Sequence, residues 1–158
     1  KTYSGIGFDI HKLVKNKKLY LGGVKIPFHS GLKGHSDGDV VLHAIIDALL
    51  GASGLGDIGA HFPDNDDTFR DSDSRVLLKH TIYMIYTKKL CVNNIDATII
   101  AERPKIGPFC ADIKEVISSD LEVSPNVINI KGTTNEKMGF IGRGEGIAAI
   151  AVCSLREI

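Results

Sequence analysis

Asp9, His11 and His43 are the side chains of this sequence whose types and spacing best suit a catalytic metal site. Asp9 and His11 are two residues apart in a segment of alternating apolar residues, so in a strand they project from the same face. Two imidazoles and one carboxylate are the ligands of a catalytic zinc site that keeps one position open, and this donor set suits Zn²⁺ better than Mg²⁺. Taken singly, the Asp-x-His pair can also be incidental, and His43 can be a core histidine held by an aspartate.

The surroundings of His43 indicate how its ring would be oriented. The residue lies in an otherwise apolar segment, where an imidazole without partners is costly to bury. Asp39 and Asp47 flank it at i−4 and i+4 on one face of the predicted helix. A ligating histidine normally donates its second ring nitrogen to a carboxylate or carbonyl. We therefore predict that Asp47 is the hydrogen-bond partner of His43.

The segment His35-Ser36-Asp37-Gly38-Asp39 directly precedes that helix. Its backbone amides, the Ser36 hydroxyl and the His35 ring are natural donors to a phosphate at a helix N-terminus. The same residues also suit a capping loop, with Ser36, Asp37 or Asp39 as the cap. The two roles are compatible.

An acidic, glycine-containing segment runs from Gly54 to Asp67. Its aspartates suggest a calcium loop, but Phe69 stands where the EF-hand pattern requires Gly, and Arg75 where it requires the bidentate Glu. The segment is therefore either a flexible loop over a site or solvated surface.

Two further polar segments lie toward the C-terminus. Residues 131–137 follow a predicted strand and offer groups that suit a diphosphate with a hard divalent cation, held through Glu136. Residues 142–146 lead into a strand rather than a helix, so a dinucleotide-binding or P-loop interpretation fails. A tight turn with a surface ion pair between Arg143 and Glu145 explains these glycines about as well as a functional role does.

Composition limits the class of protein. The chain has 158 residues, enough for one domain with its own core, which we expect to span residues 1–158. Basic and acidic residues number 19 each, so no net field would recruit nucleic acid or an anionic membrane. No apolar run approaches the ~20 residues that a membrane-spanning helix needs. The three cysteines, odd in number and far apart, argue against a disulfide framework.

Hydrophobic periodicity predicts alternating strands and helices. Strands are expected at 3–13, 91–101, 127–133 and 144–155, with a hairpin at 19–26 that turns at Gly22 and Gly23. Helices are expected at 39–50, ended by Gly51, from a cap at Ser72, Asp73 or Ser74 to about residue 89, and from Pro108 to about residue 121. A single helical turn could interrupt the connection 52–71. This order predicts an α+β two-layer sandwich whose open sheet face favours self-association.

These segments, in this order, resemble the 2-C-methyl-D-erythritol 2,4-cyclodiphosphate synthase family from Gly5 to the last strand. The stretches that carry the resemblance are GIGFDIH (5–11), HSDGDVVLH (35–43), DALLGA (47–52), GDIG (56–59), FPD (62–64), RPK (103–105), TTNEKMGF (133–140) and GRGEGIA (142–148). The resemblance implies one mixed β-sheet with helices on one face in a ferredoxin-like arrangement. It also implies a homotrimer that assembles through the sheets, with active sites at subunit interfaces.

The resemblance also implies the roles of individual residues. It makes Asp9, His11 and His43 the ligands of a catalytic zinc ion. Glu136 would hold a second divalent cation, Mg²⁺ or Mn²⁺, while His35 and Thr134 would orient the reacting phosphates and stabilise the transition state. The implied substrate-binding residues are Ser36, Asp57, Ile58, Gly59, Phe62, Pro63, Asp64, Asp66, Ala101, Pro104, Lys105, Ile106, Gly107, Thr133, Phe140 and Arg143. Asn135 departs from the family pattern, in which many members have threonine.

The implied reaction is intramolecular. It converts 4-diphosphocytidyl-2-C-methyl-D-erythritol 2-phosphate into 2-C-methyl-D-erythritol 2,4-cyclodiphosphate and CMP, in non-mevalonate isoprenoid precursor synthesis. The 2-phosphate attacks the β phosphorus, so no protein nucleophile is required. Two alternatives stay open: a zinc-dependent phosphohydrolase, in which water attacks, and a non-catalytic module that binds metal or isoprenoid phosphates.

The start and composition of the chain suggest a cellular location. It begins with Lys1 rather than Met, which indicates a processed or trimmed chain from which a leader would have been removed. The lysine- and asparagine-rich turns at 14–18 and 92–94 favour an AT-rich eukaryotic source. We therefore expect a plastid-type organelle, an apicoplast or plastid stroma, with a bacterial cytoplasm as the alternative.

Overall fold

The computed structural model describes residues 1–69 and 73–158, and Ser72, one of the three predicted helix caps, lies outside the described residues. The strands are β1 Thr2–Lys15, β2 Leu19–Leu21, β3 Val24–Ile26, β4 Ser30–Leu32, β5 Leu90–Ile100, β6 Ile128–Thr133 and β7 Gly146–Glu157. The helices are α1 Val40–Ala52, α2 Ile58–His61, α3 Ser74–Thr87, α4 Cys110–Leu121 and α5 Gly139–Gly142. Asp73 is the cap of α3. The predicted elements are present, whereas β4 and α5 were not anticipated, and Gly51 lies inside the last turn of α1.

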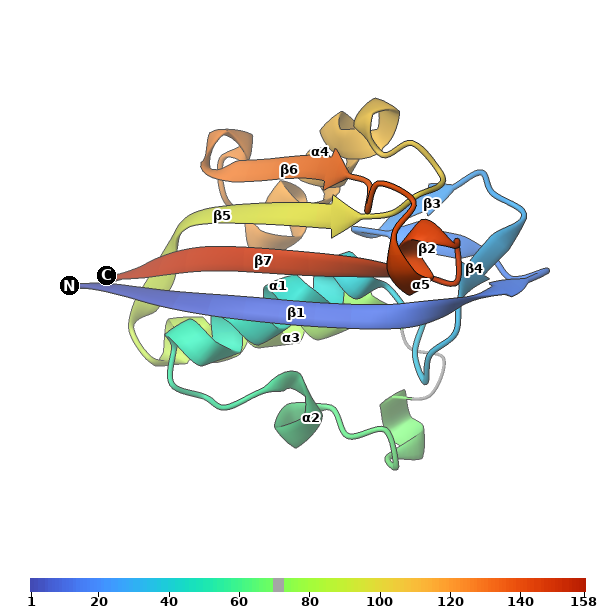
Figure 1. Ribbon diagram of the computed structural model, residues 1–158. Helices are drawn as coiled ribbons and strands as arrows, with labels where there is room; N and C mark the ends of the chain where they lie inside the picture. The colour runs from blue at the N-terminus through green and yellow to red at the C-terminus, as the bar shows by residue number, and fades with distance from the viewer. Residues whose placement is uncertain (70–72) are drawn as a thin grey trace.

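The main sheet has the strand order β4-β1-β7-β5-β6 (Figure 1). β7 pairs antiparallel with both β1 and β5. β6 is parallel to β5. Parallel neighbours need a crossover connection, and here α4 provides it. β2 and β3 form the predicted hairpin, whose turn residues Gly22 and Gly23 have φ angles of 62° and 79°. The sheet is therefore mixed, as predicted.

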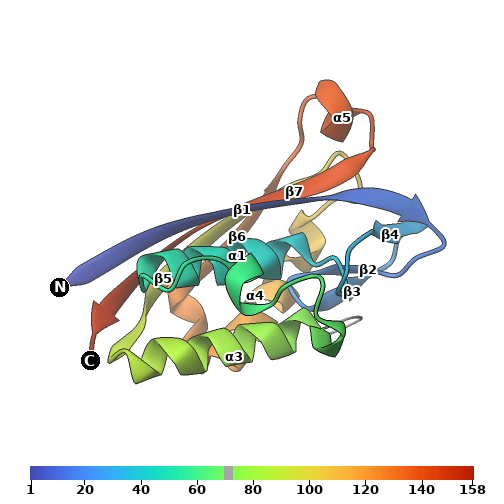
Figure 2. The ribbon, with the colours of Figure 1, turned by 90° about the horizontal axis from the view of Figure 1, so that it is seen from below.

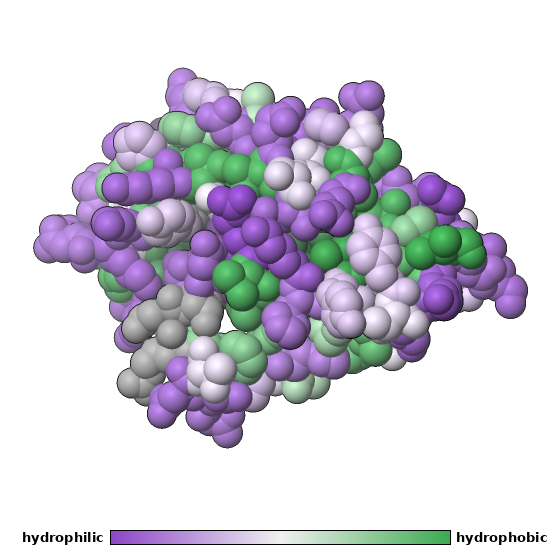
Figure 3. All heavy atoms as spheres, turned by 180° about the vertical axis from the view of Figure 1, so that it is seen from behind, coloured by the Kyte–Doolittle hydropathy of each residue, from purple (hydrophilic) through white to green (hydrophobic). Residues whose placement is uncertain are grey.

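Helices α1, α3 and α4 cover one face of this sheet (Figure 2). α1 contacts β1, β7 and α3 and is buried on nearly all sides, which accounts for its continuous apolar sequence. Viewed from the helix-covered side, the surface is mainly hydrophilic (Figure 3). No described helix combines the length and apolar character that crossing a bilayer would need. The arrangement confirms the predicted α+β two-layer sandwich.

The other face of the sheet is largely open. Among the described helices, only the short α5 lies on that side (Figure 2). Ile6 on β1 is 69% exposed and its cross-strand partner on β7, Val152, is 48% exposed. Phe8, which is 57% exposed, pairs with Ile150 in the same two strands. The uncovered apolar face that the sequence predicted is therefore present.

Strand β1 lies directly against the backbone of α1. A Cβ atom added to Gly5 would lie 2.0 Å from the carbonyl oxygen of Ala48, and one added to Gly7 would lie 1.9 Å from that of Ala44. No side chain fits in that space. Asp9 and His11 are the next residues on this face of β1, so the two glycines let the strand present its polar residues to α1.

The N-terminus of α1 is fixed by Asp39, one of the predicted caps. Its carboxylate accepts hydrogen bonds from the N–H groups of Leu42, at 3.1 Å, and of Gly22 and Gly23, at 2.9 and 2.7 Å. Burial and the nearby carboxylate of Asp37 raise the pKa of Asp39 to about 6 although these N–H groups oppose the shift. Asp39 therefore anchors the β2–β3 turn to the start of the helix that carries His43.

Replacing Gly7 with alanine tests the contact between β1 and α1. We expect Gly7→Ala to lower the free energy of unfolding by about 1–3 kcal/mol or more, because the added methyl group must push the helix backbone away. The control is Gly51→Ala, since a Cβ at Gly51 meets no atom within 4 Å and alanine in a helix is favoured by about 0.5–1 kcal/mol over glycine. Urea denaturation of both variants checks this, and equal stabilities would contradict it.

Candidate metal and substrate site

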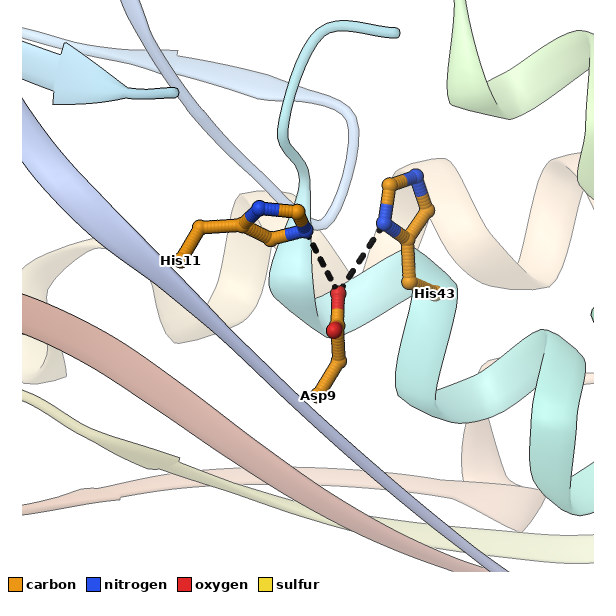
Figure 4. Close-up of side chains that lie close together, drawn as sticks. All are labelled: Asp9, His11 and His43. Carbon is orange, nitrogen blue, oxygen red and sulfur yellow. Dashed lines mark hydrogen bonds and ion pairs between the residues drawn. The ribbon is translucent and has the colours of Figure 1, made fainter. Parts of the chain in front are cut away.

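Asp9, His11 and His43 converge between β1 and α1 (Figure 4). Oδ2 of Asp9 lies 2.9 Å from Nε2 of His11 and 3.0 Å from Nδ1 of His43. One possible ligand atom from each residue lies within 4.8 Å of the other two, and all three side chains are partly buried. The strand residues and the helix residue that the sequence singled out are thus brought together as predicted.

The charges of this cluster are coupled. Burial disfavours the charged form of Asp9, but the two imidazoles outweigh it and hold the pKa of this carboxyl at about 2. Burial also acts against the protonated form of His11, yet the Asp9 carboxylate raises the pKa of this histidine overall. Asp9 is therefore an anion at neutral pH, and it attracts positive charge to the point where the rings meet.

The donor atoms fit a bound divalent cation. Nδ1 of His11 lies 2.7 Å from the carbonyl oxygen of Lys33, and because a carbonyl only accepts, this nitrogen carries the proton. In the neutral ring Nε2 then has a free lone pair that faces the Asp9 carboxylate. The buried Nε2 has no hydrogen-bond partner, since its 2.9 Å approach to Asp9 lacks hydrogen-bond geometry. Two lone pairs face each other, which a proton or a metal ion between them would relieve.

His43 is held by serines rather than by Asp47. Its Nε2 lies 2.8 Å from Oγ of Ser74 and 3.1 Å from Oγ of Ser36, whereas Oδ1 of Asp47 accepts the N–H of Ile58 at 3.1 Å. The expected pairing of Asp47 with His43 is therefore corrected. Helical side chains lean toward the N-terminus of their helix, so the imidazole reaches away from the turn that carries Asp47.

A cavity of about 570 Å³ opens beside the cluster. Of the predicted site residues, Asp9, His11, His35, Ser36, His43, Asp47, Ile58, Gly59, Phe62, Pro63 and Asp64 line it. Phe8, Gly34, Asn65, Phe69 and Leu77 line it as well, and the sequence did not indicate them as site residues. The acidic segment that the sequence left undecided therefore forms one wall of the cavity.

Two predicted substrate-binding residues of that segment accept hydrogen bonds from the backbone and do not line the cavity. Asp57 is the N-cap of α2 and accepts the N–H of Ala60 at 2.9 Å. The carboxylate of Asp66 accepts the N–H of Thr68 at 2.9 Å, while its carbonyl oxygen lies 3.4 Å from Nε2 of His35. Both residues shape the cavity wall without being part of its lining.

The remaining predicted residues lie outside this cavity. They are Ala101, Pro104, Lys105, Ile106, Gly107, Thr133, Thr134, Glu136, Phe140 and Arg143. They occupy the segment that follows β5, the last residue of β6, and the segment that runs from there through α5 to Arg143. That short helix stands on the side of the sheet away from α1 (Figure 2). One chain therefore does not bring the two groups of predicted residues together.

Glu102 organises this second group, a role that the sequence did not indicate. Its carboxylate accepts the N–H groups of Asn135 and Lys137, each at 3.1 Å, and so joins the segment after β5 to the segment after β6. Glu136 and Lys137 have positive φ angles of 52° and 61°, a conformation that such residues adopt only when their surroundings impose it. A glutamate that binds two amides of a distant loop has no local sequence signal.

Further side-chain contacts lie in the segment from Thr134 to Glu145. Oγ1 of Thr134 accepts the N–H of Glu136 at 3.2 Å. Nδ2 of Asn135, the departure from the family pattern, donates to the carbonyl of Met138 at 2.7 Å. The surface pair that the sequence left open is present, since Nε of Arg143 lies 2.5 Å from Oε2 of Glu145.

The fold and the site define a two-layer α+β protein with a candidate metal centre at a cavity. Comparison with known proteins gives the family: residues 3–156 match the model of the YgbB family. A protein of Methylobacillus flagellatus called 2-C-methyl-D-erythritol 2,4-cyclodiphosphate synthase is 56% identical over 97% of this chain and 96% of its own length. One of the same name from Prosthecochloris aestuarii is 52% identical over 97% and 98%. This chain belongs to the YgbB family.

Solved structures agree with this assignment. A structure described as the IspF CDP complex of Plasmodium falciparum has a TM-score of 0.87 and 38% identity, over 99% of this chain and 96% of that one. The bifunctional IspDF of Campylobacter jejuni has a TM-score of 0.97 and 41% identity. The match covers 100% of this chain but 43% of the bifunctional protein, so this chain corresponds to less than half of it.

The expected plastid-type location is not supported. The two curated relatives named above, and one of the same name from Thiobacillus denitrificans that is 55% identical, come from bacteria, which agrees with the bacterial alternative. The composition of a few residues is a weak guide to the source of a chain, because exposed positions accept many polar residues. Residues 92–94, moreover, lie in β5 and not in a turn.

Removing one of the three candidate ligands should abolish metal binding. We expect zinc to stabilise the wild-type protein by about 2.7 kcal/mol at a free concentration of roughly 100 times Kd. His43→Ala should lose this stabilisation, whereas His80→Ala, which changes an exposed histidine outside the cluster, should keep it. Thermal unfolding with and without zinc measures both, and stabilisation of His43→Ala equal to that of the wild type would contradict the assignment.

Proposed function

We propose that this chain converts 4-diphosphocytidyl-2-C-methyl-D-erythritol 2-phosphate into 2-C-methyl-D-erythritol 2,4-cyclodiphosphate and CMP, a step of non-mevalonate isoprenoid precursor synthesis. The observation that carries the proposal is the convergence of Asp9, His11 and His43 at a cavity lined by His35 and Ser36. Support comes from relatives of that name that match nearly the whole chain. We take residues 1–158 as one catalytic domain, which works in a bacterial cytoplasm.

In this proposal the resident cation is zinc. Oδ2 of Asp9, Nε2 of His11 and Nδ1 of His43 would hold it, since these atoms face one another. When bound, zinc supplies Lewis-acid stabilisation of negative charge on a phosphate oxygen. A second cation, Mg²⁺ or Mn²⁺, would be held by Glu136, whose exposed carboxylate makes no hydrogen bond or ion pair with the described residues. Carboxylate and phosphate oxygens are the ligands such ions prefer.

The residues of the chain contribute position and polarity. His35 and Ser36 line the cavity, and their imidazole and hydroxyl would bind phosphate oxygens there. The apolar walls, which include Phe62 and Leu77, would keep water away from the reacting phosphorus. Both reacting groups belong to one substrate, so fixing its two ends makes the attack unimolecular, and such positioning contributes up to about 7–11 kcal/mol in favourable systems.

The site would be completed by a second copy of the chain. We infer a homotrimer assembled through the open sheet faces, with the cavity of one subunit facing residues 101–107 and 133–136 of the next. The exposed strip of Ile6, Phe8 and Val152 supports this inference, since contiguous exposed apolar surface marks interaction sites. So does the position of α5 on the side of the sheet away from α1. Nucleic acid and membranes are not partners in this proposal.

Product analysis tests the reaction. A ³¹P NMR time course on the substrate, with zinc and magnesium, should show CMP and a cyclic diphosphate appearing together, and His43→Ala should form neither. CMP with a linear, hydrolysed product would instead indicate a phosphohydrolase. A folded protein that binds zinc but turns nothing over would indicate a binding module. Either of these two results would contradict the proposal.

Mixed assemblies test the shared site. His43→Ala removes a residue of the cavity, and Glu136→Ala removes a residue that the neighbouring subunit would contribute. Each variant alone should therefore be nearly inactive. If sites form between chains, subunits reassembled from a mixture should recover about a quarter of the wild-type sites by random assortment. Activity no greater than the sum of the separate variants would show that each site lies within one chain.

A further inference from the structure

We propose that Ser74 and Asp37 form a hydrogen-bond relay that positions His43 for metal binding. The inference rests on the proposed metal site and adds two residues to which the family resemblance gave no role. Neither residue lines the cavity, so both would act through His43 as positioning residues rather than by touching the substrate.

The geometry of the relay is continuous. Ser74 is the first residue of α3, is fully buried, and places its Oγ 2.8 Å from Nε2 of His43. The same hydroxyl makes a short hydrogen bond to Oδ1 of Asp37, and the N–H of Ser74 donates to Oδ2 at 2.9 Å. Asp37 in turn accepts the N–H of Asp39 at 3.1 Å. The chain of contacts therefore runs from the metal ligand to a carboxylate fixed at the starts of α1 and α3.

The hydrogen bonds of the relay are all donated in one direction, from His43 toward Asp37. Nδ1 of His43 faces Asp9, so this nitrogen must be free of its proton to bind a metal ion. The proton of the neutral ring then sits on Nε2 and is donated to Oγ of Ser74. Ser74 donates its own proton to Asp37, which as a carboxylate can only accept. The relay thus favours the tautomer that leaves Nδ1 available, and it fixes the plane of the ring.

Ser36 also lies near His43 but differs from Ser74 in two respects. Its Oγ is farther from Nε2, at 3.1 Å, and within the described part of the chain this hydroxyl makes no hydrogen bond to a carboxylate. It also lines the cavity, where a ligand can turn it away from the ring. Ser74 has no such freedom, because it is buried and held at both its N–H and its hydroxyl.

Metal affinity tests the relay without any substrate. Competition titration with a zinc chelator should show Ser74→Ala and Asp37→Asn binding about 10- to 100-fold more weakly than the wild type. Ser74→Thr keeps the hydroxyl and should recover most of the affinity. The matched control is Thr81→Val, which removes another fully buried hydroxyl of α3 that donates only to the carbonyl of Leu77. This control should lower thermal stability and leave zinc affinity unchanged.

A spectroscopic signal separates the relay from a general loss of stability. In the zinc-loaded wild type, proton NMR should show a downfield imidazole N–H resonance of His43 protected from solvent exchange, and this signal should be lost in Ser74→Ala. Folded Ser74→Ala and Asp37→Asn with wild-type zinc affinity and an unchanged signal would overturn the relay. A wild type that binds zinc but forms no cyclic product would sink the proposed reaction and leave the relay standing. A wild type that binds no zinc would overturn both.

Discussion

The direct contact between β1 and α1 is the constraint on which the rest of the structure depends. Gly5 and Gly7 allow the strand to lie against the helix backbone, and the period of two along a strand then turns Asp9 and His11 toward the same helix. Gly7 lies at Ala44, next to His43 in the sequence. Asp9 and His43, which are 34 residues apart, therefore meet because a backbone contact fixes how far along the helix the strand lies.

The polar groups at this contact hold one another in place. His11 donates to the carbonyl of Lys33, His43 contacts Ser74, and Asp39 joins the start of α1 to the β2–β3 turn. An unsatisfied buried polar group costs about 1–3 kcal/mol, so the satisfied arrangement is strongly favoured over alternatives. Nε2 of His11 is the exception among the described side chains, since it is buried without a hydrogen-bond partner. This nitrogen lacks a partner at the point where a cation would bind. A preformed metal site differs in this way from an ordinary polar core, in which the buried polar atoms are all hydrogen-bonded.

Local periodicity made part of this structure predictable. The alternation around Asp9 gave the shared face of Asp9 and His11, and the continuous apolar run gave the buried α1. Features that depend on long-range contacts could not be predicted in this way. The spacing of four residues favoured Asp47 as the partner of His43, whereas the residue in contact, Ser74, lies 31 positions away on another helix. Strand β4 is three residues long, too short to show a period. The side of the sheet on which the segment around Thr134 lies depends on the strand order, which periodicity does not encode.

Zinc X-ray absorption spectroscopy tests the central claim, that Asp9, His11 and His43 together bind the metal, most directly. We expect a first coordination sphere of nitrogen and oxygen atoms at about 2.0–2.2 Å with the outer scattering of two imidazole rings, because no cysteine belongs to the cluster of described residues. The imidazole signal should fall to one ring in His43→Ala if any zinc remains bound. Sulfur scattering at about 2.3 Å, or a spectrum that His43→Ala leaves unchanged, would contradict the account.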